Sequence, residues 1–225
     1  MSDTFTLLDS QALADLRTYL GRAGRVEDGS VRLIAAGGVL AVYAAVLYPA
    51  GLLDESPTIL GLRTFALPGM ENFDTVVPLG SLIQRIDRAE EQTRDASAPV
   101  TLGLPMPVLS VTWAAISPPR GGWVTLEPTS SVLLNHVAKA GIHEVAEAIP
   151  DGTGEQIVQR VRSEVWGRPI PEVPYVPAGA AFAALTLGFL GEDELITIFE
   201  TGPWTRLTSQ RGHVLVKRRA WSISK

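Results

Sequence analysis

The chain has no cysteine among its 225 residues, and it has only three histidines. The absence of cysteine excludes disulfide scaffolds, thiolate metal sites and cysteine nucleophiles. Charged residues make up 19% of the sequence and aromatic residues 7%, whereas apolar residues make up 46%. A chain of this length can bury a sizeable core, as one large domain or two small ones. The composition therefore indicates a folded protein with few candidates for metal or nucleophilic chemistry.

Positive charge is scarce and unevenly placed. The formal net charge of −5 argues against a nucleic-acid contact over the whole surface. Residues 203–225 are the exception, because they carry six basic side chains and no acidic one. The candidates there to contact nucleic acid or an acidic partner are Arg206, Arg211, His213, Lys217, Arg218 and Arg219. We favour the alternative that these charges form the solvated edge of a β-hairpin and block edge-to-edge aggregation.

Two features bear on the location of the protein. The N-terminal stretch carries acidic residues where a secretory signal needs basic ones, so we predict a cytoplasmic location. The run from Leu33 to Leu53 has no charge and is long enough to span a bilayer. However, Gly37-Gly38 lies between two β-prone runs, as in a two-residue hairpin turn, and the flanks lack basic clusters and aromatic belts. We predict a β-hairpin there.

The first half of the chain is predicted to be rich in strands. A helix should begin at a cap formed by Asp9 or Ser10 and end at Gly21. A second helix should run from Leu79 to Arg94. The predicted strands include Val31–Ala35, Val39–Leu47, Ile59–Leu67, Val100–Leu104, Leu109–Ile116 and Trp123–Leu126.

The second half is predicted to be helical first and to close with strands. Ser130 should cap one helix, and the Thr153-to-Gln156 spacing predicts a capping box at the start of the next. A proline-rich extended loop leads to an apolar third helix within residues 178–191. The predicted strands are Leu195–Glu200, Trp204–Thr208 and His213–Arg218. This order indicates an α+β fold, with predicted domains at residues 1–127 and 128–225.

The order of three helices and a basic hairpin over residues 130–219 resembles a winged-helix domain. The resemblance implies that the helix starting at Ala178 enters a DNA major groove. Its sequence, "AGAAFAALTLGFLG", has Thr186 as its only polar side chain, whereas base edges are read by Arg, Lys, Asn or Gln. We therefore predict that this helix is buried and reads no bases.

Residues 5–105 are similar to one module of a bacterial sliding clamp. The similarity lies in a helix, an apolar hairpin, the strand "LGLRTFAL" and the strand-into-helix "DTVVPLGSLIQRI". It implies the fold of a single module, and because a clamp ring needs several modules it does not imply the clamp's function. The whole chain also resembles small alanine-rich bacterial proteins of unknown function, which implies no chemistry.

The sequence offers no motif for catalysis, a metal or a cofactor, and we predict none of the three. His136 and His143 are seven residues apart on one predicted helix, about 10 Å along its axis, which is too far for a shared metal. Ser81 follows Gly80 but lacks the second glycine of a nucleophile elbow. If the protein is an enzyme, Arg120 and Trp123 of the "SPPRGGW" loop are the candidates to bind an anionic ligand.

The leading hypothesis from the sequence is a non-catalytic cytoplasmic binding or adaptor protein. It would act through protein–protein contacts or self-association, because the chain combines surplus apolar character with no catalytic motif. The first alternative is a DNA-associated protein that uses the basic C-terminal hairpin without reading bases. The second is an enzyme without a recognisable motif.

Overall fold

The computed structural model describes residues 4–27, 29–49, 51, 54, 56–109, 111–115, 117–150 and 153–218. The chain folds into two compact units: unit 1 comprises residues 1–45 and 62–116, and unit 2 comprises residues 46–61 and 117–225. Helices and antiparallel strands occur in both units, so the predicted α+β class is confirmed. The division into domains after residue 127 stays a proposal. Among the described helices, none is both long and apolar enough to cross a membrane.

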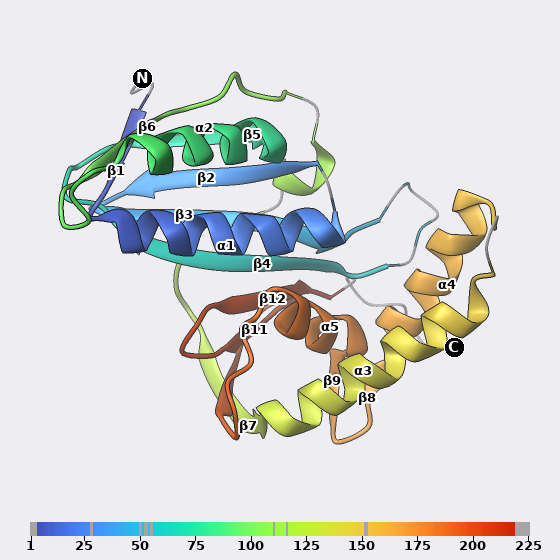
Figure 1. Ribbon diagram of the computed structural model, residues 1–225. Coiled ribbons are helices and arrows are strands. Elements are labelled where there is room, and N and C mark those ends of the chain that lie inside the picture. The colour runs from blue at the N-terminus through green and yellow to red at the C-terminus, as the bar shows by residue number, and fades with distance from the viewer. Residues whose placement is uncertain are drawn as a thin grey trace. The chain divides into compact units, whose positions relative to one another are not determined.

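Unit 1 is built on an antiparallel sheet in which β2 lies between β3 and β5. A second, two-stranded sheet pairs β1 with β6. Helices α1 and α2 pack side by side against the main sheet (Figure 1). The elements are β1 (Thr4–Leu7), α1 (Ser10–Val26), β2 (Ser30–Ala36), β3 (Val39–Leu47), β4 (Thr58–Ala66), β5 (Phe73–Pro78), α2 (Leu79–Gln92), β6 (Val100–Gly103) and the 3₁₀ helix η1 (Thr112–Ala115), with β3 and β4 each divided between the units.

The uncharged run that begins at Leu33 forms the predicted hairpin. Ala36 of β2 pairs with Val39 of β3, so Gly37 and Gly38 alone make the turn. Their φ angles are +59° and +77°, the left-handed values that a two-residue turn of this kind requires and that glycine adopts without strain. The hairpin therefore follows from local backbone chemistry. Leu52 and Leu53, at the end of the run, lie outside the described residues.

Helix α1 begins where the sequence predicts and ends later. Asp9 is the N-cap, and its carboxylate accepts a hydrogen bond from the backbone N–H of Ala12 at 2.8 Å. The predicted stop at Gly21 is wrong, because the helix continues to Val26. The extension contains Gly21 and Gly24, each with a helix penalty of about 1 kcal/mol, and burial of Ala23 in the core offsets part of it.

The segment that follows β6 also differs from the prediction. Leu109–Ile116 was expected to be a strand, but Thr112–Ala115 forms the 3₁₀ helix η1. Trp113 and Ala114 of η1 are both buried. The apolar residues that suggested a strand here instead anchor a short helix in the core. Ser110 and Ile116 lie outside the described residues.

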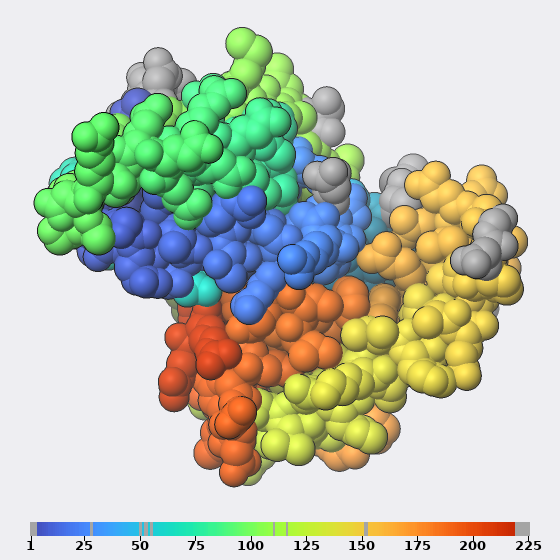
Figure 2. Space-filling model, viewed as in Figure 1, coloured from blue at the N-terminus to red at the C-terminus, as the bar shows by residue number. Residues whose placement is uncertain are grey.

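Unit 2 has an antiparallel sheet in the order β12-β11-β10-β7 and three helices, of which α3 and α5 pack against each other. Figure 2 shows α3 and α4 at the surface of this unit. The elements are β7 (Val124–Ser130), α3 (Ser131–Ala148), α4 (Glu155–Gly167), β8 (Pro169–Ile170), β9 (Val173–Pro177), α5 (Ala178–Thr186), β10 (Leu195–Thr201), β11 (Trp204–Thr208) and β12 (His213–Lys217).

Of the two helix caps predicted for unit 2, one is confirmed and one is wrong. Ser130 caps α3 as predicted, since its hydroxyl accepts a hydrogen bond from the N–H of Leu133 at 3.1 Å. The predicted capping box is wrong: Gly154 is the N-cap of α4 and makes no side-chain cap. The hydroxyl of Thr153 donates instead to the carbonyl oxygen of Pro150 at 2.6 Å.

Helix α5 is buried, as the sequence predicts. Its alanines at positions 180, 181, 183 and 184 are at most 3% exposed. It is shorter than the predicted span, because it ends at Thr186 and Gly188 follows with a φ of +74°. A buried alanine helix presents no polar side chain to a nucleic acid, so the basic strands are the remaining candidates in this half.

Candidate functional site

The register of the unit 2 sheet sorts the basic residues by face. Directly opposed residues of antiparallel strands share a face, and residues two apart on one strand share it too. Thr208 pairs with His213, and Trp204 pairs with Lys217, so both basic residues lie on the same face as Arg206. We call this the outer face, because the opposite positions, such as Leu207 of β11, are buried beneath the helices.

Arg206 is held by two aromatic rings on the outer face. Its guanidinium carbon lies 4.5 Å from the ring centroid of Trp123 and 4.4 Å from that of Phe199, which is its cross-strand partner. Trp123 is itself fixed, since its indole N–H donates to the carbonyl oxygen of Pro119 at 3.1 Å. Cation–π contacts of this kind contribute about 0.5–2 kcal/mol each. The rings therefore restrict the guanidinium to one position.

The guanidinium of Arg206 has no hydrogen-bond acceptor among the described residues. Its Nε is buried and unpartnered, and its Nη atoms make no hydrogen bond or ion pair to the described part of the chain. Burial lowers the pKa of Arg206, because the charged form is partly desolvated. The group stays cationic at neutral pH. Arg206 therefore carries a positive charge at a fixed position, and its N–H groups make no hydrogen bond to a described residue.

His213 lies close to this charge. Its Nδ1 is 3.0 Å from the hydroxyl of Thr208, on the neighbouring strand. Burial, and to a lesser extent the positive charge of Arg206, lower the pKa of His213 below its usual value. Protonation of the ring therefore adds a second, poorly solvated positive charge to this surface.

We expect the free energy of unfolding to decrease as the pH falls below about 6.5, the ordinary pKa of histidine. The unfolded chain takes up a proton on His213 there, whereas the folded chain resists it, so stability present above this pH is lost on acidification. Urea unfolding between pH 5 and 7.5 measures the slope. His213→Gln should reduce it, because the variant has no ring to protonate at this position. An unchanged slope in His213→Gln would contradict this assignment.

The other predicted contact residues are dispersed. Arg211 lies in the β11–β12 turn, where its Nη1 donates to the carbonyl oxygen of Leu190 at 3.4 Å. Lys217 is half-buried and Arg120 is exposed, and neither makes an ion pair with a described residue. Arg219 lies outside the described residues. The structure thus brings Arg206, His213 and Trp123 together, although the sequence analysis named Trp123 for a different site.

Arg218 belongs to a second feature, a groove of about 360 Å³ in unit 2. Nη2 of Arg218 contacts Oε2 of Glu200 at 3.3 Å and the carbonyl oxygen of Gly202 at 3.2 Å, while its Nε is buried without a partner. We call the feature the proline groove, since four of its eight lining residues are prolines. They are Pro57, Gly167, Pro169, Pro174, Tyr175, Pro177, Val216 and Arg218.

Polar contacts fix the walls of the proline groove. The guanidinium of Arg168, beside Pro169, makes a bidentate pair with Glu144 of α3 at 2.6 and 2.9 Å. The carbonyl oxygen of Arg168 accepts a hydrogen bond from the N–H of Ala178 at 2.7 Å. The hydroxyl of Tyr175 donates to the carbonyl oxygen of Glu127 at 3.4 Å. The groove is therefore already formed in the free chain.

A serine cluster supports the Pro57 side of the groove. The hydroxyls of Ser56 and Ser163 contact each other, and both donate to Oδ1 of Asp54, at 2.6 and 3.2 Å. The cluster joins the segment before β4 to α4. It contains no histidine or lysine to act as a base, so its geometry is that of a structural tie. In the described part of the chain, no group of three or more His, Asp or Glu side chains is arranged to hold a metal.

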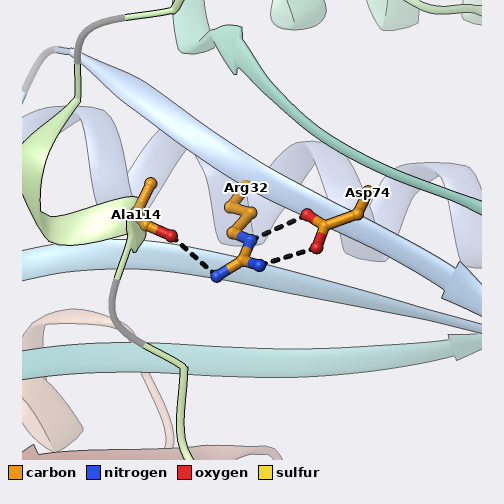
Figure 3. A network of polar contacts seen from close by, with 3 residues as sticks. All are labelled: Arg32, Asp74 and Ala114. Carbon is orange, nitrogen blue, oxygen red and sulfur yellow. Dashed lines mark hydrogen bonds and ion pairs between the residues drawn. The ribbon is translucent and has the colours of Figure 1, made fainter.

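Unit 1 has its own polar network, between the sheet and η1. Arg32 of β2 donates to both carboxylate oxygens of Asp74 of β5, at 2.8 and 2.6 Å (Figure 3). Its Nη1 donates to the carbonyl oxygen of Ala114 at 2.7 Å. The hydrogen bonds to Asp74 raise the pKa of Arg32. Each of the three guanidinium nitrogens donates a hydrogen bond within unit 1, so the network stabilises the fold.

The two halves of the chain match the models of two different protein families. Residues 1–106 match the model of a domain of unknown function, DUF8010. Residues 118–221 match the model of another domain of unknown function, DUF8185. No curated protein matches the chain.

The fold is similar to that of bacterial sliding clamps. One is the DNA polymerase III beta subunit of Bartonella birtlesii bound to griselimycin, with a TM-score of 0.55, 12% identity and coverage of 98% of this chain and 66% of the clamp. A second structure from that species has a TM-score of 0.50 and 13% identity, with coverage of 99% of this chain and 64% of the clamp. The Caulobacter crescentus clamp has a TM-score of 0.47 and 15% identity, with coverage of 99% of this chain and 67% of the clamp.

This chain spans about two thirds of the length of those clamps. The predicted likeness to a clamp module is therefore confirmed at the level of the fold. It extends beyond residues 5–105 to nearly the whole chain, so the expectation that the chain has room for a single module is corrected. The winged-helix resemblance stays an unconfirmed prediction.

Proposed function

We propose that this protein is a non-catalytic binding protein, an adaptor, that holds an extended segment of a partner protein in the proline groove of unit 2. The observation that carries the proposal is a preformed apolar groove with one incompletely paired cation, Arg218, in its wall. Its volume of about 360 Å³ lies within the range of small-molecule sites.

The walls suit an extended peptide. Prolines cannot rotate about φ, so Pro169, Pro174 and Pro177 lose little conformational entropy when a ligand binds. Tyr175 adds an aromatic face whose position is set by its hydrogen bond to Glu127. Grooves lined by aromatic and rigid apolar side chains bind segments that are themselves extended, because such segments are ordered at low cost.

Arg218 defines the polar anchor of the partner segment. Its pair with Glu200 is half-exposed and 3.3 Å long, and such pairs contribute little to stability. An incoming carboxylate could take a bidentate position on the guanidinium, which Glu200 does not. The proposed occupant is therefore an extended apolar segment that carries one acidic residue. Griselimycin, bound to one of the matched clamps, supports a ligand-binding role for this fold.

We expect peptides selected on the full-length chain from a displayed random library to be extended, apolar and singly acidic. Tyr175→Ala should weaken their binding about 30-fold or more, because an aromatic anchor in a groove contributes about 2 kcal/mol. Arg218→Gln should weaken the binding of acidic peptides about tenfold. It should not change the binding of the same peptides when their acidic residue is replaced by its amide. Fluorescence anisotropy of labelled peptides measures both effects.

Arg160→Gln is the matched control, since Arg160 is exposed on α4 and lies outside the groove. Peptides that bind the Tyr175→Ala chain as well as the original chain would count against the groove. If light scattering shows a mass that rises with concentration and Tyr175→Ala abolishes the rise, the occupant is a second copy of the chain and the partner-peptide proposal is wrong.

DNA association is the second candidate. It is supported by the placement of Arg206, His213 and Lys217 on one sheet face, and opposed by the contacts that engage Arg211 and Arg218. Duplex DNA anisotropy at about 50 mM salt separates the two candidates, because a phosphate contact weakens steeply as salt rises. A cytoplasmic location and the enzymatic alternative stay untested predictions.

A further inference from the structure

We propose that Arg206 is the centre of an oxyanion-binding site on the outer face of unit 2, which takes a single phosphate or carboxylate group of a small ligand. The site shares no residue with the proline groove, so it stands or falls independently of the proposed function. Three observations carry it: the fixed position of the guanidinium, its unused donors, and the composition of the surrounding face.

The first observation is preorganisation. A surface arginine normally loses side-chain entropy when it binds an anion. Here the rings of Trp123 and Phe199 already hold the guanidinium carbon at 4.5 and 4.4 Å from their centroids. Aromatic rings attract the cation but accept no conventional N–H hydrogen bond from it in the plane of the guanidinium. Ordering therefore costs less, and the donors stay available.

The second observation is that these donors have no acceptor. Arginine carries five N–H donors in a planar fork that matches two oxygens of a carboxylate or phosphate. In the described part of the chain no carboxylate or carbonyl accepts from Arg206. By contrast, Arg32, Arg168 and Arg218 each contact at least one carboxylate. Arg206 differs from these residues because its guanidinium is held in place and yet has no carboxylate partner among the described residues, so an external oxyanion can take that position.

The third observation concerns the neighbouring side chains. The outer-face positions of β10, β11 and β12 carry no acidic residue. The cross-strand partners of Arg206 are Phe199 and the buried Leu215. Hydroxyl groups occupy further positions of this face: Thr208 is two residues along β11, Thr197 pairs with Thr208, and Thr125 pairs with Phe199. Hydroxyls donate hydrogen bonds to oxyanions, and His213 adds a ring nitrogen on the same face. The strand positions beside Arg206 are therefore rich in donors, and the nearest acidic cluster, Glu192–Glu194, lines a hollow with Thr197 and Thr208 at the edge of this face.

The number of fixed guanidinium groups determines which class of ligand this face can bind. A duplex presents a row of phosphates and needs several cations in line. Here one guanidinium is fixed, and Lys217, two residues further along the strand pair, is about 7 Å away along the strand. One bidentate contact suits one oxyanion of about the size of phosphate. We therefore assign the site to a small phosphorylated or carboxylated compound.

Titration with inorganic phosphate at constant ionic strength tests the assignment, with acetate as the carboxylate arm. The Nε–H of Arg206 is buried, so its proton NMR signal should be protected from exchange with water and serve as the reporter. We expect a saturable shift of that signal. Arg206→Lys should weaken phosphate binding about tenfold or more, because lysine lacks the planar pair of N–H donors of the guanidinium. Isothermal titration calorimetry should show a smaller heat of binding for this variant.

Trp123→Leu keeps the arginine and removes one ring, so it should weaken binding by a smaller factor of about three to ten while the chain stays folded. Arg160→Lys, at an exposed arginine of α4, should leave binding unchanged. A shift that grows linearly without saturation, or equal affinity in Arg206→Lys, overturns the proposal. Tight duplex binding that Arg206→Lys abolishes, without saturable phosphate binding, assigns the surface to nucleic acid instead.

Discussion

Gly141→Ala is expected to lower the free energy of unfolding by about 3 kcal/mol, through overpacking in the core of unit 2. A Cβ at this position of α3 would overlap Cζ3 of Trp166 and would lie 2.7 Å from its Cη2. Trp166 is 2% exposed and stacks on Phe182 of α5, with 4.4 Å between the ring centroids. The indole has no free space to move into, so α3 or α4 must shift. Urea unfolding followed by circular dichroism measures the loss.

Gly80→Ala is the matched control in another helix. A Cβ at Gly80 of α2 would meet nothing within 4 Å, so the change should be neutral or stabilise the protein by up to about 1 kcal/mol. Shrinking the neighbour should rescue the first variant: Trp166→Leu combined with Gly141→Ala should lose less stability than the sum of the single changes. Full additivity would mean that the two side chains do not collide, and that the packing of α3 on α4 is misassigned.

Features with a local physical cause could be predicted from the sequence. The Gly37-Gly38 turn follows from a backbone conformation that glycine adopts without strain, and the capping of α3 by Ser130 from a hydroxyl beside free N–H groups. The burial of α5 follows from its composition, since alanine and leucine leave no polar side chain to solvate. In each case the residues within a few positions decide the outcome.

Features that depend on distant partners could not be predicted in this way. The extension of α1 past Gly21 and the turn of helix at Thr112–Ala115 are both decided by what these segments bury against the rest of unit 1. Local preferences are weak priors that such packing overrides.

The candidate sites show the same limit. Trp123 and Arg206 were both named from the sequence, but as members of two different sites, because nothing local indicates that the loop before β7 crosses to β11. Phe199 and the proline groove were missed altogether. One signal was present: the period of two along β12 separates Lys217 from Arg218, and so predicts that the basic residues do not form one patch.

Asp74→Ala is expected to lower the free energy of unfolding by about 2 kcal/mol, through the network that joins β2, β5 and η1. The change removes both carboxylate contacts of Arg32, whose side chain is 16% exposed, and keeps its hydrogen bond to the carbonyl oxygen of Ala114. Removing the counter-ion of a largely buried charge costs several kcal/mol, but Asp74 is half-exposed, and water can partly replace it. Asp74→Asn, which keeps one carbonyl acceptor, should lose about half as much.

The double variant separates the ion pair from the third contact. Arg32→Met with Asp74→Ala removes both charges, so it should be more stable than Asp74→Ala alone if the cost arises from the stranded guanidinium. Arg32→Met also removes the donor to Ala114, which holds η1 and its buried neighbour Trp113. Hydrogen exchange at residues 112–115 should therefore quicken in Arg32→Met but not in Asp74→Ala. Equal exchange in both variants would mean that Trp113 packing, and not Arg32, holds η1 in place.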